Sequence, residues 1–243
     1  MKAIVLAAGF GTRLRPLTNN TPKPLLPLGD RSVIEYNLLL LKKYGITEVA
    51  VNLHYHGEKI RKALGDGRKL GMQLLYSEEP QILGTGGGIK KVSRFLSDGT
   101  FLALNGDILV DINLDKVVEL HRLKKSTATM VLREDPNVEA YGAIELDSKG
   151  RIRRFLGQPD WQGEKLSPYM FTGIHVLEPQ IFQYIPSQRF SPITDAYRAM
   201  LKKGERLFGY LMKSYWRDLG TPQSYRQAKA DLKKGTARLS YII

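Results

Sequence analysis

Residues 3–16 read AIVLAAGFGTRLRP, an apolar run that passes directly into a glycine-rich loop. This form predicts a buried parallel strand over residues 3–7 that ends in the loop. Gly9 and Gly11 allow the backbone to turn tightly and to bring N–H groups close to a phosphate, and Arg13 adds a charged, bidentate donor. The spacing lacks the Gly-Lys-Ser/Thr of a P-loop and the third glycine of a dinucleotide fingerprint.

Strand and helix signals alternate downstream of this loop, which predicts a parallel sheet with helices on both faces. After about residue 125 shorter strands with turn residues between them follow, with a hairpin turn at 147–150. We therefore predict an α/β fold with a Rossmann-like mixed, mostly parallel sheet, as one domain over 1–243. Residues 1–125 would be its nucleotide-binding half, and residues 126–243 would cover that half. The expected strands are 3–7, 48–52, 73–76, 101–104, 127–132, 142–146, 151–155, 170–177 and 207–212, and the expected helices 32–44, 58–64, 85–95, 193–201 and 222–232.

The composition excludes several classes of protein. The chain has 243 residues and no cysteine, which excludes disulfides, cysteine–zinc sites and thiol catalysis. No apolar run approaches the roughly 20 residues of a membrane span, and residues 1–8 lead into the glycine loop and not into a cleavage site. We therefore expect a cytoplasmic protein without a signal peptide or membrane contact.

The net charge is +13, from 37 Lys and Arg against 24 Asp and Glu. The basic clusters are short, at 42–43, 151–154, 202–203 and 233–234, and no aromatic residues alternate with them. A scattered basic surface is therefore favoured over a nucleic-acid-binding function.

The segment TPKPLLP at 21–27 places a proline on each side of Lys23. Prolines stiffen the backbone and limit where that side chain can point. A rigidly held lysine close to a phosphate loop is favoured over a solvated one.

LAAGFGTRLRPLT followed by TPKPLLPLG resembles the sugar-1-phosphate nucleotidyltransferases, also called NDP-sugar pyrophosphorylases. LGTGGG at 83–88, NGD at 105–107, FTGI at 171–174 and WRDLGTP at 216–222 are similar to further landmarks of that family, so the resemblance covers essentially the whole chain. It is strongest to compact N-acetylmuramate-1-phosphate uridylyltransferases, with mannose-1-phosphate guanylyltransferase-like members next. Many of the latter carry a C-terminal left-handed β-helix, and this chain shows no hexapeptide repeat. The resemblance implies a GT-A-like fold in which residues 126–243 form the sugar-binding half.

The resemblance also implies roles for individual residues. Arg13, Lys23 and Asp107 would be catalytic, and Mg²⁺ would be held by Asp107 and Asp218, since it prefers hard oxygen ligands and often takes one or two carboxylates. The residues implied in nucleotide binding are Leu6, Ala7, Ala8, Gly9, Gly11, Thr12, Arg13, Lys23, Glu79, Gly84 and Thr85. Those implied in sugar binding are Asn105, Gly142, Thr172 and Gly173.

The resemblance leaves two points open, the role of Glu79 and the cation that binds the acceptor phosphate. Glu79 could accept hydrogen bonds from guanine or from uracil, or it could be a solvated carboxylate. Many relatives have Glu-Lys-Pro where this chain has Gly157-Gln158-Pro159, so the usual acceptor-phosphate lysine is missing. Arg153, Arg154 or Lys165 could replace that cation, and the lost glutamate could leave room for a larger sugar.

The implied function is Mg²⁺-dependent transfer of a nucleotidyl group from UTP or GTP to a sugar 1-phosphate. No general base is needed, because the attacking phosphate is already ionised near pH 7. UTP with N-acetylmuramate 1-phosphate is the first expectation, for a monomer or small homo-oligomer that supplies cell-wall or polysaccharide precursors. The alternatives are a mannose- or heptose-1-phosphate guanylyltransferase and an inactive sugar-nucleotide-binding regulatory subunit.

Overall fold

The computed structural model describes residues 1–138 and 142–242. Contacts within the chain divide it into two compact units. The first unit contains residues 1–82, 104–112 and 214–243, and the second contains 83–103 and 113–213. These units do not coincide with the expected halves 1–125 and 126–243, because the chain returns to the first unit after residue 213. Which half binds nucleotide and which binds sugar stays a prediction.

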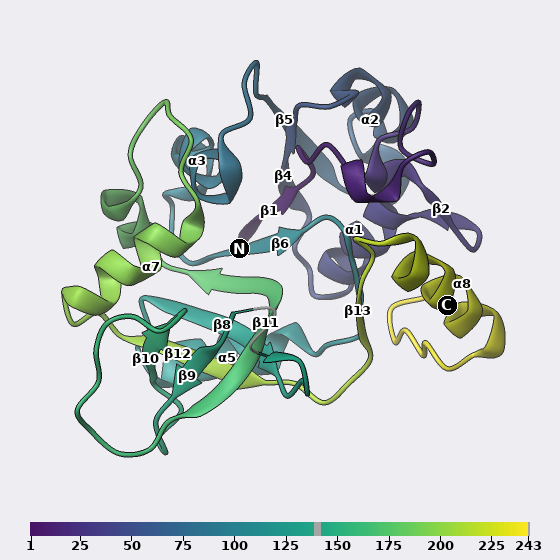
Figure 1. Ribbon diagram of the computed structural model, residues 1–243. Helices are drawn as coiled ribbons and strands as arrows, with labels where there is room; N and C mark the ends of the chain where they lie inside the picture. Colours follow the sequence, from purple (N-terminus) through teal and green to yellow (C-terminus); the bar gives the residue numbers. More distant parts are fainter. Residues whose placement is uncertain (139–141, 243) are drawn as a thin grey trace. The chain divides into compact units, whose positions relative to one another are not determined.

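The first unit is built on three parallel strands. Strand β4 pairs with β1 on one side, with Ala3 opposite Val49, and with β5 on the other. Strands β1 and β4 are apolar and mostly buried, as a parallel sheet covered on both faces requires. Strand β5, at the end of the strand order, has only Ser77 buried. Figure 1 labels the larger elements of this unit. The elements are β1 (Lys2–Leu6), η1 (Thr12–Leu14), η2 (Lys23–Leu25), β2 (Pro27–Leu28), β3 (Arg31–Ser32), α1 (Val33–Lys43), β4 (Glu48–Leu53), α2 (Gly57–Leu64), η3 (Arg68–Leu70), β5 (Gln73–Glu78), β7 (Ile108–Val110), β13 (Trp216–Asp218) and α8 (Pro222–Lys234).

Two helices of the first unit begin at the predicted caps. Ser32 precedes α1, and its backbone N–H donates to Glu35 Oε2 at 2.7 Å in a capping box. Thr221 precedes α8, accepts from the Ser224 N–H at 3.1 Å, and is followed by a proline at the first helical position. Helix α1 packs its apolar face on β1 and β7. The predicted strands and helices of this unit are confirmed to within a few residues.

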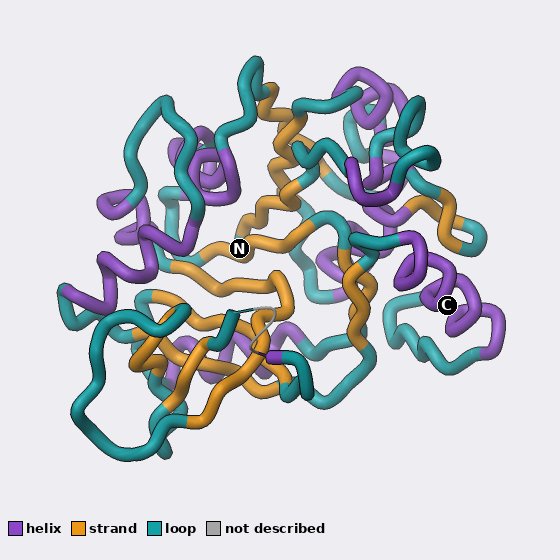
Figure 2. The backbone as a smooth tube through the Cα atoms, viewed as in Figure 1, coloured by secondary structure: helices purple, strands orange, loops and turns teal. Residues whose placement is uncertain are grey.

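The second unit is mostly antiparallel. Its longest strand, β11, pairs antiparallel with β8 and with β9, and β12 adds to β8 in parallel. Helix α5 packs on β8, β11 and β12. Figure 2 shows these strands in orange; the elements are α3 (Gly84–Lys91), α4 (Ser93–Leu96), β6 (Phe101–Asn105), α5 (Leu114–Leu123), β8 (Ala128–Arg133), β9 (Ile144–Leu146), β10 (Ile152–Phe155), β11 (Ser167–Leu177), η4 (Pro179–Tyr184), α7 (Ile193–Lys202) and β12 (Leu207–Leu211).

The second unit confirms the predicted hairpin turn, in which the Gly150 N–H donates to the Asp147 carbonyl at 3.0 Å between β9 and β10. The helix expected over 85–95 is interrupted at Val92 and forms α3 and α4. Helix α5 and the short strands β7 and β13 were not among the expected elements. The α/β class with a mixed, partly parallel sheet flanked by helices is confirmed, and no helix among the described residues is long and apolar enough to cross a membrane.

Candidate functional site

The glycine-rich loop leaves β1 under tight hydrogen-bond control. Leu6 ends the strand, and the buried Ala7 donates its N–H to Asn52 Oδ1 at 2.7 Å. Gly11 has φ +65, and a Cβ at that position would lie 3.1 Å from the Thr18 methyl carbon. Only glycine adopts this conformation without strain at so close an approach. The loop is therefore fixed at its start and at its second glycine.

The residues between these fixed points are accessible. Ala8 is buried, but Gly9 is exposed, and Thr12 and Arg13 lie exposed in the 3₁₀ turn η1. Exposed backbone N–H groups and a guanidinium on one short loop are the donors that bind phosphate oxygens.

Lys23 lies in the proline-flanked turn η2 and is 7% exposed. Its Nζ contacts Asp107 Oδ2 at 2.5 Å. A buried ammonium needs such a partner, because desolvation penalises an unpaired charge. The predicted rigid lysine therefore points at the predicted metal carboxylate.

A two-stranded ladder brings Asp107 and Asp218 together. Strand β13 pairs antiparallel with β7, with Asp218 opposite Ile108. The Leu219 N–H donates to the Asp107 carbonyl at 3.0 Å, so the two carboxylates leave neighbouring points of the ladder. Gly106, just before Asp107, donates its N–H to the Leu6 carbonyl at 2.9 Å, which ties this turn to the end of β1.

Arg13 lies close to Asp218. A Cβ on Gly220 would clash with Asp218 Oδ1 and lie 2.7 Å from Arg13 NH2, so both side chains would have to shift to admit it. The positive charge of Arg13 also acts on the Asp218 carboxyl group. The Gly220 N–H also donates to Asp218 Oδ1 at 2.7 Å. Lys23, Asp107, Asp218 and Arg13 form one group of side chains, which we call the carboxylate cluster.

Charge repulsion is visible in this cluster. Burial and the neighbouring Asp107 raise the pKa of Asp218, against the opposing effect of the Lys23 and Arg13 charges. A divalent cation between the carboxylates would relieve that repulsion. The donor set fits Mg²⁺, which takes hard oxygen ligands and completes its shell with water and substrate phosphates. No group of three or more potential metal ligands occurs in residues 1–138 and 142–242, so the protein would supply two carboxylates.

Glu79 is buried and engaged within the first unit. It is 3% exposed and accepts from Asn52 Nδ2 at 2.8 Å, while its backbone N–H donates to the Leu53 carbonyl at 2.7 Å. Asn52 thus links Glu79 to the Ala7 N–H of the glycine loop. Neither the sequence patterns nor the resemblance identified Asn52, although a polar residue near the end of a buried strand beside β1 is a usable signal.

Gly84 and Thr85 lie at the start of α3 in the second unit. A Cβ on Gly84 would lie 2.9 Å from the Ser191 carbonyl oxygen, and one on Gly86 would meet the same atom at 2.9 Å. The Gly87 N–H donates to that carbonyl at 3.1 Å. Close packing on residues 189–192 therefore accounts for at least part of this glycine-rich segment, and nucleotide binding by Gly84 and Thr85 stays a prediction.

The predicted sugar residues fall into two groups. Asn105 ends β6 and is half-buried. In the second unit Thr172 is 1% exposed and donates its hydroxyl to the Val131 carbonyl at 2.8 Å. The next residue, Gly173, has φ +89 where the β11 register shifts. Gly142 has φ +85, and a Cβ there would clash with Leu156. Sugar binding by these residues remains a prediction.

Two of the three cations that could replace the missing lysine at Gln158 have local carboxylate partners. Arg153 Nε contacts Asp147 Oδ2 at 2.7 Å, and Arg154 NH1 contacts Glu145 Oε1 at 3.2 Å. The described structure therefore does not single out a replacement.

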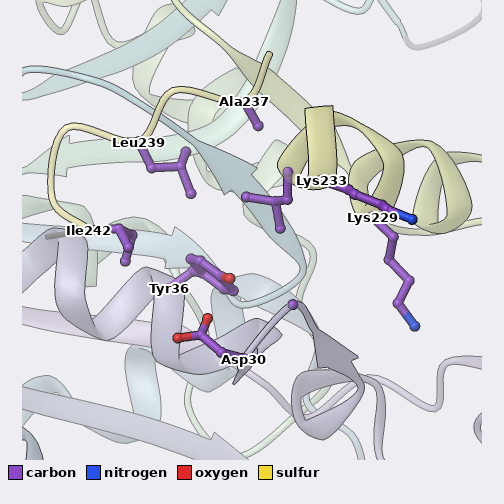
Figure 3. Close-up of a pocket in the computed structure, with 9 residues that line it drawn as sticks. Asp30, Tyr36, Lys229, Lys233, Ala237, Leu239 and Ile242 are labelled. Carbon is purple, nitrogen blue, oxygen red and sulfur yellow. The ribbon is translucent and has the colours of Figure 1, made fainter. Parts of the chain in front are cut away.

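The first unit also contains a hollow between residues 29–36 and the C-terminal segment. Its volume is about 600 Å³, and its lining contains none of the predicted site residues. Figure 3 shows Tyr36 facing Leu239 and Ile242, with Lys229 and Lys233 extending from α8. The Tyr36 hydroxyl donates to the Leu28 carbonyl at 2.7 Å. This hollow is largely apolar and lacks the phosphate donors of the glycine loop.

Known proteins resemble this chain over most of its length. UTP–glucose-1-phosphate uridylyltransferase of Synechocystis sp. is 37% identical over 242 residues, which cover 94% of this chain and 62% of the relative. N-acetylmuramate alpha-1-phosphate uridylyltransferase of Neisseria meningitidis serogroup B is 33% identical over 233 residues, which cover 95% of this chain and 97% of the relative. A Bacillus anthracis protein assigned as a glucose-1-phosphate thymidylyltransferase and solved with sucrose matches with a TM-score of 0.82 and 28% identity, over 95% of this chain and 94% of that one.

The chain spans less than two thirds of the length of several curated relatives that it matches, 62% in the Synechocystis case. The model of the family described as nucleotidyl transferase matches residues 2–235. That range contains the glycine loop, Lys23 and both aspartates of the carboxylate cluster. The chain therefore belongs to the nucleotidyl transferase family.

Proposed function

We propose that this protein transfers a nucleotidyl group from a nucleoside triphosphate to a sugar 1-phosphate. A phosphate oxygen of the sugar phosphate attacks the α-phosphorus and forms the new P–O bond. The bond from that phosphorus to the oxygen that bridges to the β-phosphate breaks, and pyrophosphate leaves with the electron pair. The observation that carries this proposal is the carboxylate cluster, which places two cations and two carboxylates next to the glycine loop.

Both reactants are anions, so the catalytic task is positioning and charge neutralisation. Arg13 and the backbone N–H groups of Gly9, Gly11 and Thr12 would bind the leaving phosphates. Lys23, whose ammonium contacts Asp107, would donate a hydrogen bond to the α-phosphate. The α-phosphate and the Asp107 carboxylate would then compete for the N–H donors of this lysine. These donors act where negative charge shifts during the reaction.

Asp107 and Asp218 would hold Mg²⁺ through their carboxylate oxygens. When bound, this ion would neutralise charge on the substrate phosphates. The acceptor phosphate is already ionised near neutral pH, so none of the protein's side chains has to remove a proton from it.

For the substrates we propose UTP and N-acetylmuramate 1-phosphate or a similar sugar. The names of the Synechocystis and Neisseria relatives support a uridine nucleotide, and the Neisseria relative matches over nearly its whole length. The uncharged Gln158 supports a sugar unlike those bound through a Glu-Lys pair. Two functions compete with this proposal. One is that of a mannose- or heptose-1-phosphate guanylyltransferase, and the other is that of an inactive regulatory subunit.

The test is pyrophosphate release with five nucleoside triphosphates (UTP, GTP, dTTP, CTP and ATP) crossed against a panel of sugar 1-phosphates. The panel contains N-acetylmuramate, N-acetylglucosamine, glucose, mannose and heptose 1-phosphates, with and without Mg²⁺. We expect release that needs Mg²⁺, one nucleotide and one sugar phosphate. Asp107→Asn should lower the rate about 100-fold or more, since it removes a preorganised charge from the site.

Asp66→Asn is the matched control, because Asp66 is an exposed carboxylate of the same unit that pairs with Arg68 outside the cluster. It should keep the wild-type rate. An Asp107→Asn protein as active as wild type would contradict the proposed role. Nucleotide binding without release from any pair would indicate a regulatory subunit.

A further inference from the structure

A cavity in the second unit is lined by none of the residues implied in nucleotide, sugar or metal binding, although Arg153, a candidate to replace the missing lysine at Gln158, is part of its lining. Its volume is about 390 Å³, within the range of small-molecule sites. It lies among the end of α5, the β9–β10 hairpin and the start of β12. The residues that line it are Lys124, Asp147, Lys149, Arg151, Arg153, Arg206 and Phe208.

This cavity, which we call the basic cavity, lies at one end of β8. Phe208 of β12 pairs with Thr129 near the start of β8. Thr172 instead donates to Val131, and Phe171 pairs with Leu132 near the other end of the strand. The predicted sugar contact at Thr172 and the basic cavity therefore lie at opposite ends of the same strand.

The lining has five basic side chains and a single carboxylate, which is already satisfied. Asp147 accepts from the backbone N–H groups of Lys149 and Arg151 at 3.0 and 2.9 Å and from Arg153 Nε at 2.7 Å. Its side chain is 2% exposed. Asp147 thus forms its salt bridge with Arg153, and its charge opposes the repulsion at Arg151 only in part.

Backbone carbonyls hold two of these cations without neutralising them. Arg151 NH2 donates to the carbonyls of Gly204 and Glu205 at 3.0 and 3.1 Å. Arg206 NH2 donates to the Lys124 carbonyl. In the described part of the chain, no carboxylate forms a salt bridge with Lys124, Lys149, Arg151 or Arg206.

The cations repel one another. Burial and then the charges of Arg153 and Arg206 lower the pKa of Arg151 from its ordinary value. The ammonium of Lys124 lies over the Phe208 ring, 5.4 Å from its centroid, which holds it at the cavity. The repulsion between these like charges raises the energy of the empty cavity, and a bound anion would reduce that repulsion.

We propose that the basic cavity binds a small anion that carries two or more phosphate groups. Guanidinium groups bind phosphate oxygens through parallel N–H donors, and the two lysines add mobile point charges. The concave shape and small volume favour a compact ligand over a nucleic-acid strand, which needs an extended basic surface with stacking aromatics.

The test uses inorganic tripolyphosphate as the probe, titrated by calorimetry into the full chain at low and moderate salt. Because the cations of the carboxylate cluster can also bind the probe, the titration is repeated with Arg13→Ala/Lys23→Ala. The cavity variant is Lys149→Glu/Arg206→Glu, which reverses two exposed charges. Lys62→Glu/Lys69→Glu is the control, since it makes the same change in net charge at two exposed lysines of the first unit.

We expect tripolyphosphate to bind to wild type, to Arg13→Ala/Lys23→Ala and to the control with similar affinity at the basic cavity. The cavity variant should lose about 100-fold at this site, from two phosphate contacts of about tenfold each. Circular dichroism shows whether the cavity variant is folded, and soaking crystals of the wild type with tungstate locates the anion by anomalous scattering.

Equal affinities of the cavity variant and the control would overturn the proposal, as would anomalous signal only at the glycine loop. Binding of heparin without binding of tripolyphosphate would overturn it in favour of a macromolecular polyanion. The outcome does not depend on turnover, so the proposed transferase activity could fail while the basic cavity is confirmed, or the reverse.

Discussion

Acidification should destabilise this protein through a buried histidine of β11. His175 is 0% exposed, and its Nδ1 lies 2.5 Å from the Tyr197 hydroxyl. Burial lowers the pKa of His175 from 6.5 to about 3. The folded protein therefore keeps this ring neutral at a pH where the unfolded chain protonates it.

The sign and size follow from proton linkage. A depressed pKa in the folded state means that the unfolded state binds more protons below pH 6.5, so stability falls as the pH drops from 6.5 toward 3. Between pH 7 and pH 5 the loss is about 2 kcal/mol, because the unfolded histidine gains most of its proton in this interval and the folded one gains almost none. The loss in stability changes little if the folded-state pKa of His175 is one unit higher or lower.

The measurement is urea unfolding of wild type and His175→Asn at pH 7 and pH 5. Asparagine does not titrate and can still hydrogen-bond the Tyr197 hydroxyl, although it leaves a small void that lowers stability equally at both pH values. The wild type should lose about 2 kcal/mol more than the variant between the two conditions. The buried His121 is present in both proteins, so its contribution cancels. Parallel pH dependences in the two proteins would refute the reasoning.

Two further substitutions test how the glycine loop is held. Gly106→Ala should cost about 1–3 kcal/mol in urea unfolding, because its Cβ would lie 2.7 Å from the Leu6 carbonyl oxygen and force the Asp107 turn away from β1; unchanged stability would contradict this packing. Asn52→Leu should cost about 1–3 kcal/mol, since the Ala7 N–H loses a buried acceptor, and it should also weaken nucleotide binding measured by calorimetry. A variant with wild-type stability and affinity would show that this hydrogen bond does not position the loop.

Most helices and strands were predictable because their signals are local. The capped helix α1 and the buried strands β1 and β4 are specified by apolar spacing and by residues at their ends. Strands β7 and β13 were not predicted, because three residues show no periodicity. Each of these strands is stable only through its partner about a hundred residues away in the chain.

The residues of the candidate site could be predicted from the sequence, but their burial and hydrogen-bond partners could not. The order of the motifs pointed to Lys23, Asp107 and Asp218. The β7–β13 ladder brings the two aspartates together, and Lys23 reaches Asp107 from η2. Glu79 illustrates the limit, because its neighbour Glu78 is exposed while Glu79 is 3% exposed and bonded to Asn52. Nothing in two adjacent glutamates tells which of them faces the interior.

The sequence by itself determined the α/β class, the glycine loop and the family to which the chain is similar, because these depend on residue types within short windows. The tertiary structure alone decided that Asp218 meets Asp107 and that Asn52 links Glu79 to the loop. It also decided that five cations converge at the basic cavity with Asp147 as the one carboxylate in its lining. The physical reason is that these arrangements arise from strand pairing and burial between distant segments. Such long-range contacts fix where a side chain points, and local sequence does not encode them.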